Sequence, residues 1–195
     1  MSQLAIVDVG YGNTDSIRLA FARLGVEALM TDDPSVVERA ERLVLPGVGS
    51  AAFAMARLGR LGIDQALRRR TRPTLGICLG MQLMFGHSEE GDTQCLGLVD
   101  GNVRALFPQP GSPVPHMGWS RLDWADERTG LAASDYLYFA HSFACDDGPL
   151  TAARATYGGC RLPAALRAGH LWGAQFHPER SSTAGARFLQ AFLAA

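Results

Sequence analysis

Residues 74–82 read Thr74-Leu75-Gly76-Ile77-Cys78-Leu79-Gly80-Met81-Gln82, a segment that indicates a strand followed directly by a helix. Its first part, Thr74–Cys78, is an apolar run typical of a buried strand, and Leu79–Phe85 has the pattern of a helix. A residue between two glycines at such a junction is lifted above the sheet on a sharp turn, where the helix dipole favours a thiolate. Cys78 is therefore a candidate nucleophile, and the alternative is a buried structural cysteine.

Upstream of this stretch, apolar runs and helical patterns alternate. The expected strands are Leu4–Val9 and Leu43–Leu45. The expected helices are a segment stopped by Gly25 that carries Ile17, Phe21 and Leu24, then Ser35–Arg42, then Ala51–Leu67 with an interruption near Gly59 and Gly62. Repeated strand–helix units predict a parallel sheet with helices on both faces.

The second half of the chain has a different character. Strand-like segments separated by proline-rich turns are expected at Gly97–Phe107, Tyr136–Phe143, Thr151–Tyr157 and Leu171–Phe176, followed by a terminal helix at about Thr183–Leu193. We therefore predict one α/β domain over residues 1–195, with a mostly parallel central sheet and extra antiparallel strands in the second half.

Composition excludes several classes of protein. All 18 basic residues are arginine, so chemistry that needs a lysine amine is excluded: Schiff-base enzymes, pyridoxal-phosphate enzymes and P-loop NTPases. A coding bias explains the missing lysine as well as any functional cause. The net charge of −1 gives no indication of a nucleic-acid partner, and the basic run Arg68–Arg72 is expected to be a solvated loop.

The sequence also indicates a compartment. No uncharged run reaches the roughly 20 apolar residues that a membrane span needs, and the N-terminus has no basic region or cleavage site of a signal peptide. The four cysteines form no CxxC pair. We therefore expect a cytoplasmic protein with free thiols, in which Cys95, Cys145 and Cys160 are structural or incidental.

A cysteine nucleophile needs a base, and the base needs an orienting group. His177-Pro178-Glu179 supplies both residue types, directly after the predicted strand Leu171–Phe176. Residues i and i+2 of an extended segment face the same way, so Glu179 can hold the His177 ring. Spacing alone does not show that Cys78 and His177 meet, but both follow apolar strands at the carboxyl edge of the sheet, where ligands bind in such folds.

A thioester mechanism also needs donors for the oxyanion. Pro46-Gly47-Val48-Gly49 is a glycine-rich turn that ends the strand Leu43–Leu45 at the same edge. One donor is expected from this turn and another from the backbone of Leu79, the residue after the nucleophile. The alternative is a plain strand-to-helix turn.

These motifs resemble those of the triad-type, class I glutamine amidotransferases. The resemblance rests on Leu45–Gly49, Gly76–Gln82 and Gln175–Glu179. Within that family, three further segments are similar to the glutaminase subunit of imidazole glycerol phosphate synthase, an enzyme of histidine biosynthesis: Gly10–Asn13, Pro115–Trp119 and Tyr138–Phe143. The match covers essentially the whole chain.

The resemblance implies a mechanism without metal or cofactor. Cys78 attacks the side-chain amide of glutamine, Gly47, Val48 and Leu79 stabilise the oxyanion, and His177, oriented by Glu179, moves the protons. Water then releases glutamate from the thioester. The residues implied to hold the amino-acid end of glutamine are Gln82 and the backbone of His141, Ser142 and Phe143.

The resemblance also implies a partner. Ammonia would pass to a (βα)₈-barrel cyclase subunit that makes imidazole glycerol phosphate and AICAR, and without this partner the chain would be a poor glutaminase. Asn13, Trp119, Tyr138 and Arg180 lie at positions that face the cyclase in the family. Three positions depart from the usual pattern: Ser120 replaces an asparagine, Ser142-Phe143 replaces a tyrosine-containing pair, and Arg180 replaces a lysine with a planar, fork-shaped cation.

Other readings stay open at this point. The chain could be a different class I amidotransferase subunit, for instance for pyridoxal phosphate or anthranilate. It could be a silent module that stabilises its partner, although an intact Cys78, His177 and Glu179 argue against that. A peptidase-like or chaperone-like protein with a cysteine elbow is disfavoured by the His-Pro-Glu segment.

Overall fold

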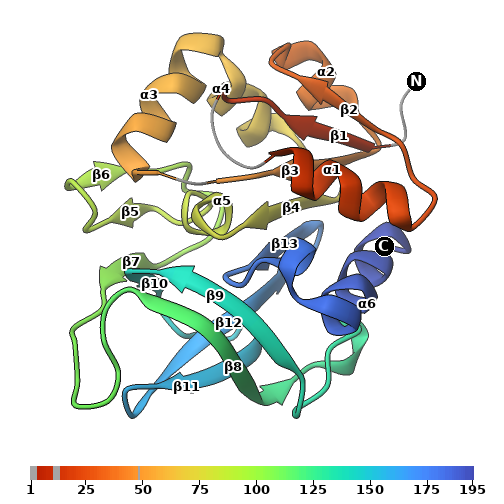
Figure 1. The fold of residues 1–195 in the computed structure, drawn as a ribbon. Coiled ribbons are helices and arrows are strands. Elements are labelled where there is room, and N and C mark those ends of the chain that lie inside the picture. Colours follow the sequence, from red (N-terminus) through yellow and green to blue (C-terminus); the bar gives the residue numbers. More distant parts are fainter. Residues whose placement is uncertain (1–3, 11–13, 48) are drawn as a thin grey trace.

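A large mixed sheet runs through the molecule (Figure 1). The computed structural model describes residues 4–10, 14–47 and 49–195. Over these residues the sheet has nine strands in the order β2-β1-β3-β4-β13-β12-β11-β8-β9. A smaller sheet of four strands, in the order β10-β7-β5-β6, lies beside it.

The first half of the large sheet is parallel. Its strands are β1 (Leu4–Val7), β2 (Ala28–Thr31), β3 (Arg42–Leu45), β4 (Thr74–Ile77) and β13 (Leu171–Ala174). The remaining strands pair antiparallel: β8 (His116–Ala125), β9 (Tyr136–His141), β11 (Thr151–Tyr157) and β12 (Cys160–Ala168). The small sheet consists of β5 (His87–Ser88), β6 (Thr93–Gln94), β7 (Asn102–Ala105) and β10 (Phe143–Cys145).

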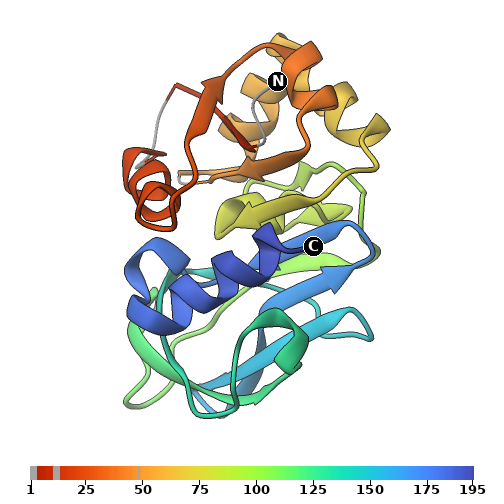
Figure 2. The same ribbon diagram turned by 90° about the vertical axis from the view of Figure 1, so that its right-hand side faces the viewer.

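Helices cover both faces of the parallel half. They are α1 (Thr14–Arg23), α2 (Pro34–Arg39), α3 (Ala51–Leu61), α4 (Ile63–Arg69), α5 (Leu79–Gln82) and α6 (Ser182–Leu193), with 3₁₀ turns η1 (Glu127–Thr129) and η2 (Pro178–Arg180). Figure 2 shows α1 and α6 on one side and α2 to α4 on the other. No helix in the described ranges is long and apolar enough to cross a membrane.

The burial pattern explains this arrangement. In β1, Leu4 and Ile6 pack in a core with α1 and α6, whereas Ala5 and Val7 pack in a second core with α2, α3 and α4. Because side chains alternate across a strand, a strand buried on both faces must be apolar throughout. The predicted α/β fold with antiparallel strands in the second half is confirmed.

Several predicted element boundaries were wrong. The expected helix Ala51–Leu67 is two helices, α3 and α4, which are separated at Gly62 in the left-handed region (φ 70°); Gly59 lies inside α3 without breaking it. A left-handed residue ends a helix because it turns the chain away from the helix axis. The expected helix Leu79–Phe85 ends earlier, at Gln82.

The antiparallel half differed most from expectation. β8 and β12 were not predicted, and the expected strand Gly97–Phe107 is reduced to β7. In the parallel half, β2 was also not predicted. The expected strand Tyr136–Phe143 divides at Ser142, where the chain leaves the large sheet at the end of β9 and enters the small sheet as β10.

The basic run Arg68–Arg72 is not a solvated loop. Arg68 and Arg69 belong to α4, and the side chain of Arg70 is buried, with an exposed fraction of 4%. The Arg70 guanidinium donates to the carbonyls of Val37, Glu38 and Ala40 at the end of α2, and to the carbonyl of Pro73. A buried cation is tolerated here because it satisfies helix-end carbonyls that have no partner within the helix.

Candidate active site

The elbow at Cys78 is a strained turn that only glycine neighbours permit. Cys78 has φ 53° and ψ −112°, a region that non-glycine residues rarely adopt. A Cβ on Gly76 would lie 2.5 Å from the carbonyl oxygen of Gly80, and a Cβ on Gly80 would overlap the carbonyl oxygen of Leu45. The two glycines therefore let β3, β4 and α5 approach closely enough to place the thiol at the edge of the sheet.

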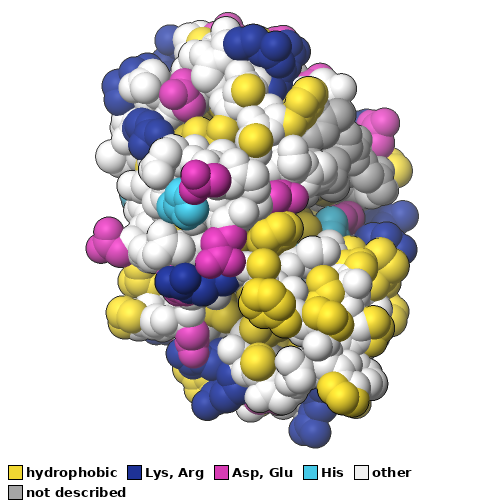
Figure 3. Space-filling model, turned by 90° about the vertical axis from the view of Figure 1, so that its left-hand side faces the viewer, with side chains coloured by type: hydrophobic (Ala, Val, Ile, Leu, Met, Phe, Trp, Pro, Cys, Tyr) yellow, Lys and Arg dark blue, Asp and Glu magenta, His cyan; other side chains and the backbone are white. Residues whose placement is uncertain are grey.

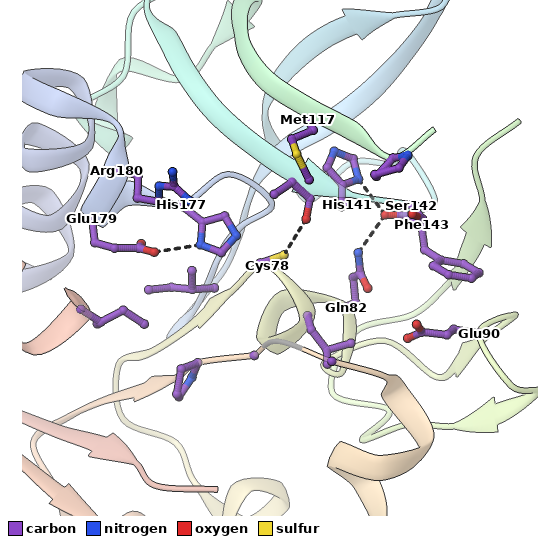
Figure 4. A pocket seen from close by; sticks show the side chains of 18 of the residues that line it. Cys78, Gln82, Glu90, Met117, His141, Ser142, Phe143, His177, Glu179 and Arg180 are labelled. Carbon is purple, nitrogen blue, oxygen red and sulfur yellow. Dashed lines mark hydrogen bonds and ion pairs between the residues drawn. The ribbon is translucent and has the colours of Figure 1, made fainter. Parts of the chain in front are cut away.

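The thiol lies in a cavity of about 470 Å³. Figure 4 shows His177, Glu179 and Arg180 on one side of Cys78, and Gln82 with the segment His141–Phe143 on the other. The lining comes from the loops after β3, β4, β9 and β13, together with Thr14 and Ile17 of α1, Glu90, and Pro115 and Met117. The carboxyl edge of the sheet thus holds the predicted site.

Strand order explains why Cys78 and His177 meet. β4 and β13 are parallel neighbours, with Ile77 opposite Ala174, so both residues follow the carboxyl ends of adjacent strands. The Nδ1 of His177 lies 2.8 Å from the Oε1 of Glu179, whose side chain is only 4% exposed. The predicted nucleophile, base and orienting carboxylate therefore lie together at one site.

Electrostatics indicate a charged imidazole. Burial by itself lowers the pKa of His177, but Cys78 and Glu179 outweigh it and together raise this pKa to about 10. The ring is therefore an imidazolium at neutral pH, and cysteine nucleophiles beside such a cation react as thiolates.

Gln175 belongs to the motif Gln175–Glu179, but no role at the site was predicted for it. It is fully buried, and its Nε2 lies 3.8 Å from the Sγ of Cys78, so it donates to the sulfur. The Sγ also lies 3.8 Å from the carbonyl oxygen of Ala140. A polar side chain two residues before His177 in an otherwise apolar run was the available signal, since i and i+2 share a face.

The predicted oxyanion residues are described in part. Gly47 is buried against Leu79 and the backbone nitrogen of Gly80, so a Cβ at Gly47 would overlap α5. Gly47 and Leu79 both line the cavity beside Cys78. Val48, the third predicted residue, lies outside the described residues.

Three of the four predicted glutamine-binding residues, Gln82, His141 and Phe143, form one hydrogen-bonded group, and the fourth, Ser142, lines the same cavity. The Nε2 of Gln82 donates both to the carbonyl of Phe143, at 2.8 Å, and to the Oε1 of Gln175, at 3.0 Å. The Nδ1 of His141 donates to the same Phe143 carbonyl at 2.8 Å. Both amide protons of Gln82 are therefore engaged, and only its carbonyl oxygen can bind a ligand.

Glu90 was also missed. It lines the cavity, and its Oε2 accepts a 2.7 Å hydrogen bond from the backbone nitrogen of Ala51 at the start of α3. This bond holds the first residue of α3, which follows the glycine-rich turn. No local pattern around Glu90 indicated the role, because its partner is 39 residues away in the chain.

Three of the predicted interface residues lie together near the cavity. The guanidinium of Arg180 lies 4.1 Å from the centre of the Tyr138 ring, and the rings of Trp119 and Tyr138 meet edge to face with centroids 6.1 Å apart. Trp119 is 52% exposed. Asn13, the fourth, lies outside the described residues.

The other cysteines are free thiols apart from the catalytic chemistry. Cys95 and Cys145 are buried and Cys160 is exposed. Burial raises the pKa of Cys95 to about 11 and the pKa of Cys145 well above its ordinary value. Buried thiols of this kind are chemically inert.

Comparison with known proteins gives a consistent result. The family model for "Glutamine amidotransferase class-I" matches residues 5–195. The imidazole glycerol phosphate synthase subunit HisH of Xylella fastidiosa strain Temecula1 is 47% identical, and that of Xanthomonas campestris pv. campestris strain 8004 is 46% identical; each alignment covers 99% of this chain and 98% of the relative. A solved structure described as a glutamine amidotransferase superposes with a TM-score of 0.75 at 22% identity, covering 98% of this chain and 97% of the other.

The structural match, at 22% identity, shows the fold alone, whereas the sequence matches extend over nearly the full length of both chains. The chain belongs to the class I glutamine amidotransferase family, and within it to the HisH subunits of imidazole glycerol phosphate synthase.

Proposed function

We propose that this chain is one glutamine amidotransferase domain that hydrolyses glutamine at Cys78 and delivers the ammonia to a barrel-shaped cyclase subunit in histidine biosynthesis. The observation that carries the proposal is the Cys78–His177–Glu179 constellation in the cavity, where Glu179 holds the His177 ring and the ring is charged. Family membership supports it, because the relatives are subunits of imidazole glycerol phosphate synthase.

The cavity can orient the substrate. Glu90 contributes a carboxylate to the lining. The Nε2 of Gln82 is already hydrogen-bonded, so the Oε1 of Gln82 is the side-chain atom that can accept from a ligand. Both oxygen groups suit the α-ammonium of glutamine. The backbone N–H of Phe143 points to the same side of strand β10 as the carbonyl that bonds Gln82, and this donor suits the α-carboxylate. The side-chain amide of glutamine then extends toward Cys78.

The chemistry proceeds by transfer of the acyl group to sulfur. The thiolate of Cys78 attacks the amide carbon, and the oxyanion is stabilised by backbone N–H groups of Leu79 and of the turn at Gly47 and Val48. The imidazolium of His177 gives its proton to the nitrogen as the C–N bond breaks, which releases ammonia and leaves a thioester. His177, now neutral, takes a proton from water as the water attacks, and the sulfur departs from glutamate.

The decisive experiment uses the chain in complex with its cyclase. We expect Cys78→Ser to reduce glutamine-dependent synthesis by at least roughly 10³-fold, because the nucleophile is lost, while synthesis from added ammonia persists. Cys160→Ser is the matched control, since it removes an exposed thiol far from the chemistry. Glutamate release is measured with and without the cyclase and its nucleotide ligand. Continued glutamine hydrolysis by Cys78→Ser would overturn the assignment of the nucleophile.

A further inference from the structure

A series of linked hydrogen bonds, from Ser120 through His116 and His141 to Phe143, connects strand β8 to the substrate cavity. The Nε2 of His116 lies 2.8 Å from the hydroxyl of Ser120, and its Nδ1 lies 3.0 Å from the Nε2 of His141. The Nδ1 of His141 lies 2.8 Å from the carbonyl oxygen of Phe143. His116 and His141 are both buried and face each other across the paired strands β8 and β9.

The protons in this series of hydrogen bonds have one arrangement. A carbonyl only accepts, so the Nδ1 of His141 must donate to Phe143. In a neutral imidazole the other nitrogen then accepts, so His141 receives its bond from the Nδ1–H of His116. By the same argument the Nε2 of His116 accepts from the hydroxyl of Ser120. Every bond thus points from Ser120 toward the cavity.

Both rings are held neutral. Burial lowers the pKa of His116 to about 4. Burial also lowers the pKa of His141 to about 4; repulsion from His116 and His177 adds to this effect, and the hydrogen bond to Phe143 opposes it. His116 is also fixed between two rings: Phe139 at a centroid distance of 4.7 Å and Tyr157 at 3.9 Å, both nearly parallel to it. The ring therefore has a fixed place, orientation and tautomer.

The series of hydrogen bonds ends at the carbonyl of Phe143, on which the substrate pocket depends. The Phe143 carbonyl accepts from both His141 and Gln82, so its direction sets the position of the Gln82 amide. The backbone nitrogen of Leu106 donates to Ser142, which places Phe143 at the position where N–H and C=O point away from β7. The N–H of Phe143 therefore faces the same side as its bonded carbonyl.

We propose that His116 is a positioning residue for glutamine: through His141 it fixes the Phe143 carbonyl, and thereby the Gln82 oxygen and the Phe143 N–H that hold the amino-acid end of the substrate. This inference rests on the proposed function. His116 touches neither substrate nor Cys78, so its removal should weaken recognition of the amino-acid end while leaving the reactivity of the thiol unchanged.

The test is covalent labelling of Cys78 in the full-length chain, followed by mass spectrometry. One reagent is a chloroketone with the amino-acid end of glutamine, a second is a chloroketone without that end, and the third is iodoacetamide. His116→Asn keeps an N–H donor near the position of Nδ1, whereas His116→Gln moves its amide to the position of Nε2 and loses the bond to His141. His116→Phe keeps the ring stack but has no polar atom.

We expect His116→Gln and His116→Phe to slow labelling by the glutamine-shaped reagent roughly tenfold, with iodoacetamide labelling unchanged and with His116→Asn close to the original rate. Tyr157→Phe, which keeps the stack on His116, is the control and should label normally. In turnover assays with the cyclase, KM for glutamine should rise more than kcat falls. Because Asn and Gln form a matched pair of polar variants, the comparison stands even where His116→Phe does not fold.

Two outcomes would overturn the proposal and its foundation separately. Equal labelling by the glutamine-shaped reagent in the Asn and Gln variants, or a parallel loss with iodoacetamide, would show that His116 does not position the substrate. If the original chain does not distinguish the chloroketone that carries the amino-acid end from the one that lacks it, the proposed function itself fails.

Discussion

At the scale of single residues, Glu179 is the group whose environment says most about the mechanism. Its Oε1 accepts from His177, and its Oε2 is buried and has no hydrogen-bond partner among the described residues. Burying a carboxylate with one unpaired oxygen is unfavourable unless a cation compensates for it. The imidazolium of His177 is that cation, so the charge of this ring compensates for the burial of Glu179.

We expect Glu179→Gln to lower kcat of glutamine hydrolysis by between roughly 10²- and 10⁴-fold, because the ring loses its orienting charge. The pKa of His177 should fall, since one of the two groups that raise it is removed. An NMR titration of the ring and a glutaminase assay measure the two effects. An unchanged pKa would show that Cys78 alone keeps the ring charged.

The same shift gives a dependence of stability on pH. The pKa of His177 is raised from 6.5 in the unfolded chain to about 10 in the folded one, so its stabilising contribution is fully present below pH 6.5 and is lost as the pH rises through about 10. Because the chain has no lysine, no amine side chain titrates in this window. Urea unfolding at pH 7 and pH 10 should show a smaller loss for Glu179→Gln than for the original chain, and equal losses would contradict the shift.

At the scale of elements, three glycines allow the turn after β3 and the elbow after β4 to pack with their backbones in direct contact. Gly47 lies in the turn after β3, and Gly76 and Gly80 flank the elbow between β4 and α5. A Cβ at Gly47 would overlap the backbone of Gly80, a Cβ at Gly80 would overlap the backbone of Leu45, and a Cβ at Gly76 would overlap the backbone of Gly80. Gly47 and the elbow at Cys78 are therefore fixed relative to each other by backbone contact.

We expect Gly80→Ala to destabilise the fold by about 2–3 kcal/mol and to abolish glutamine hydrolysis, because the new methyl overlaps the carbonyl of Leu45. Gly59→Ala is the matched control: Gly59 is an exposed position inside α3 with no atom near its Cβ, so the change should be neutral or stabilising by up to about 1 kcal/mol. Urea unfolding and a glutaminase assay decide between them. Full activity in Gly80→Ala would show that the close packing is unnecessary.

At the scale of the whole molecule, the edge of the large sheet presents an apolar surface next to the cavity. Figure 3 shows hydrophobic side chains gathered on the half of the molecule formed by the antiparallel strands. Cross-strand partners on the outer face of β8 and β9 are Met117 with Ala140, Trp119 with Tyr138, and Arg121 with Tyr136. Met117 and Ala140 also line the cavity, so this surface leads directly to Cys78.

If this surface binds the cyclase, Trp119→Arg should weaken association at least roughly tenfold, because exposed tryptophans at interface centres carry much of the binding energy. Trp124→Arg is the matched control: it lies on the same strand and is 40% exposed, but outside this surface. Titration of the cyclase with each variant measures the dissociation constants. Equal weakening by both changes, or by neither, would place the interface elsewhere.

Much of the site could be predicted because its backbone geometry depends on residues close together in the sequence. Glycines at fixed positions around Cys78 specify the elbow, and alternation along an extended chain puts His177 and Glu179 on one side. The unpredicted parts depend on residues far apart: Gln175 on Gln82, Glu90 on Ala51, and His116 on His141.

Short-range backbone geometry and residue type were enough to predict a nucleophile, a base and an orienting carboxylate at Cys78, His177 and Glu179. In contrast, the position of β13 beside β4, the pairing of β8 with β9 and the burial of Arg70 were seen only in the folded molecule. The physical reason is that strand order and register follow from the packing of the whole core. Local periodicity reports which face of an element is apolar, but not which element covers it.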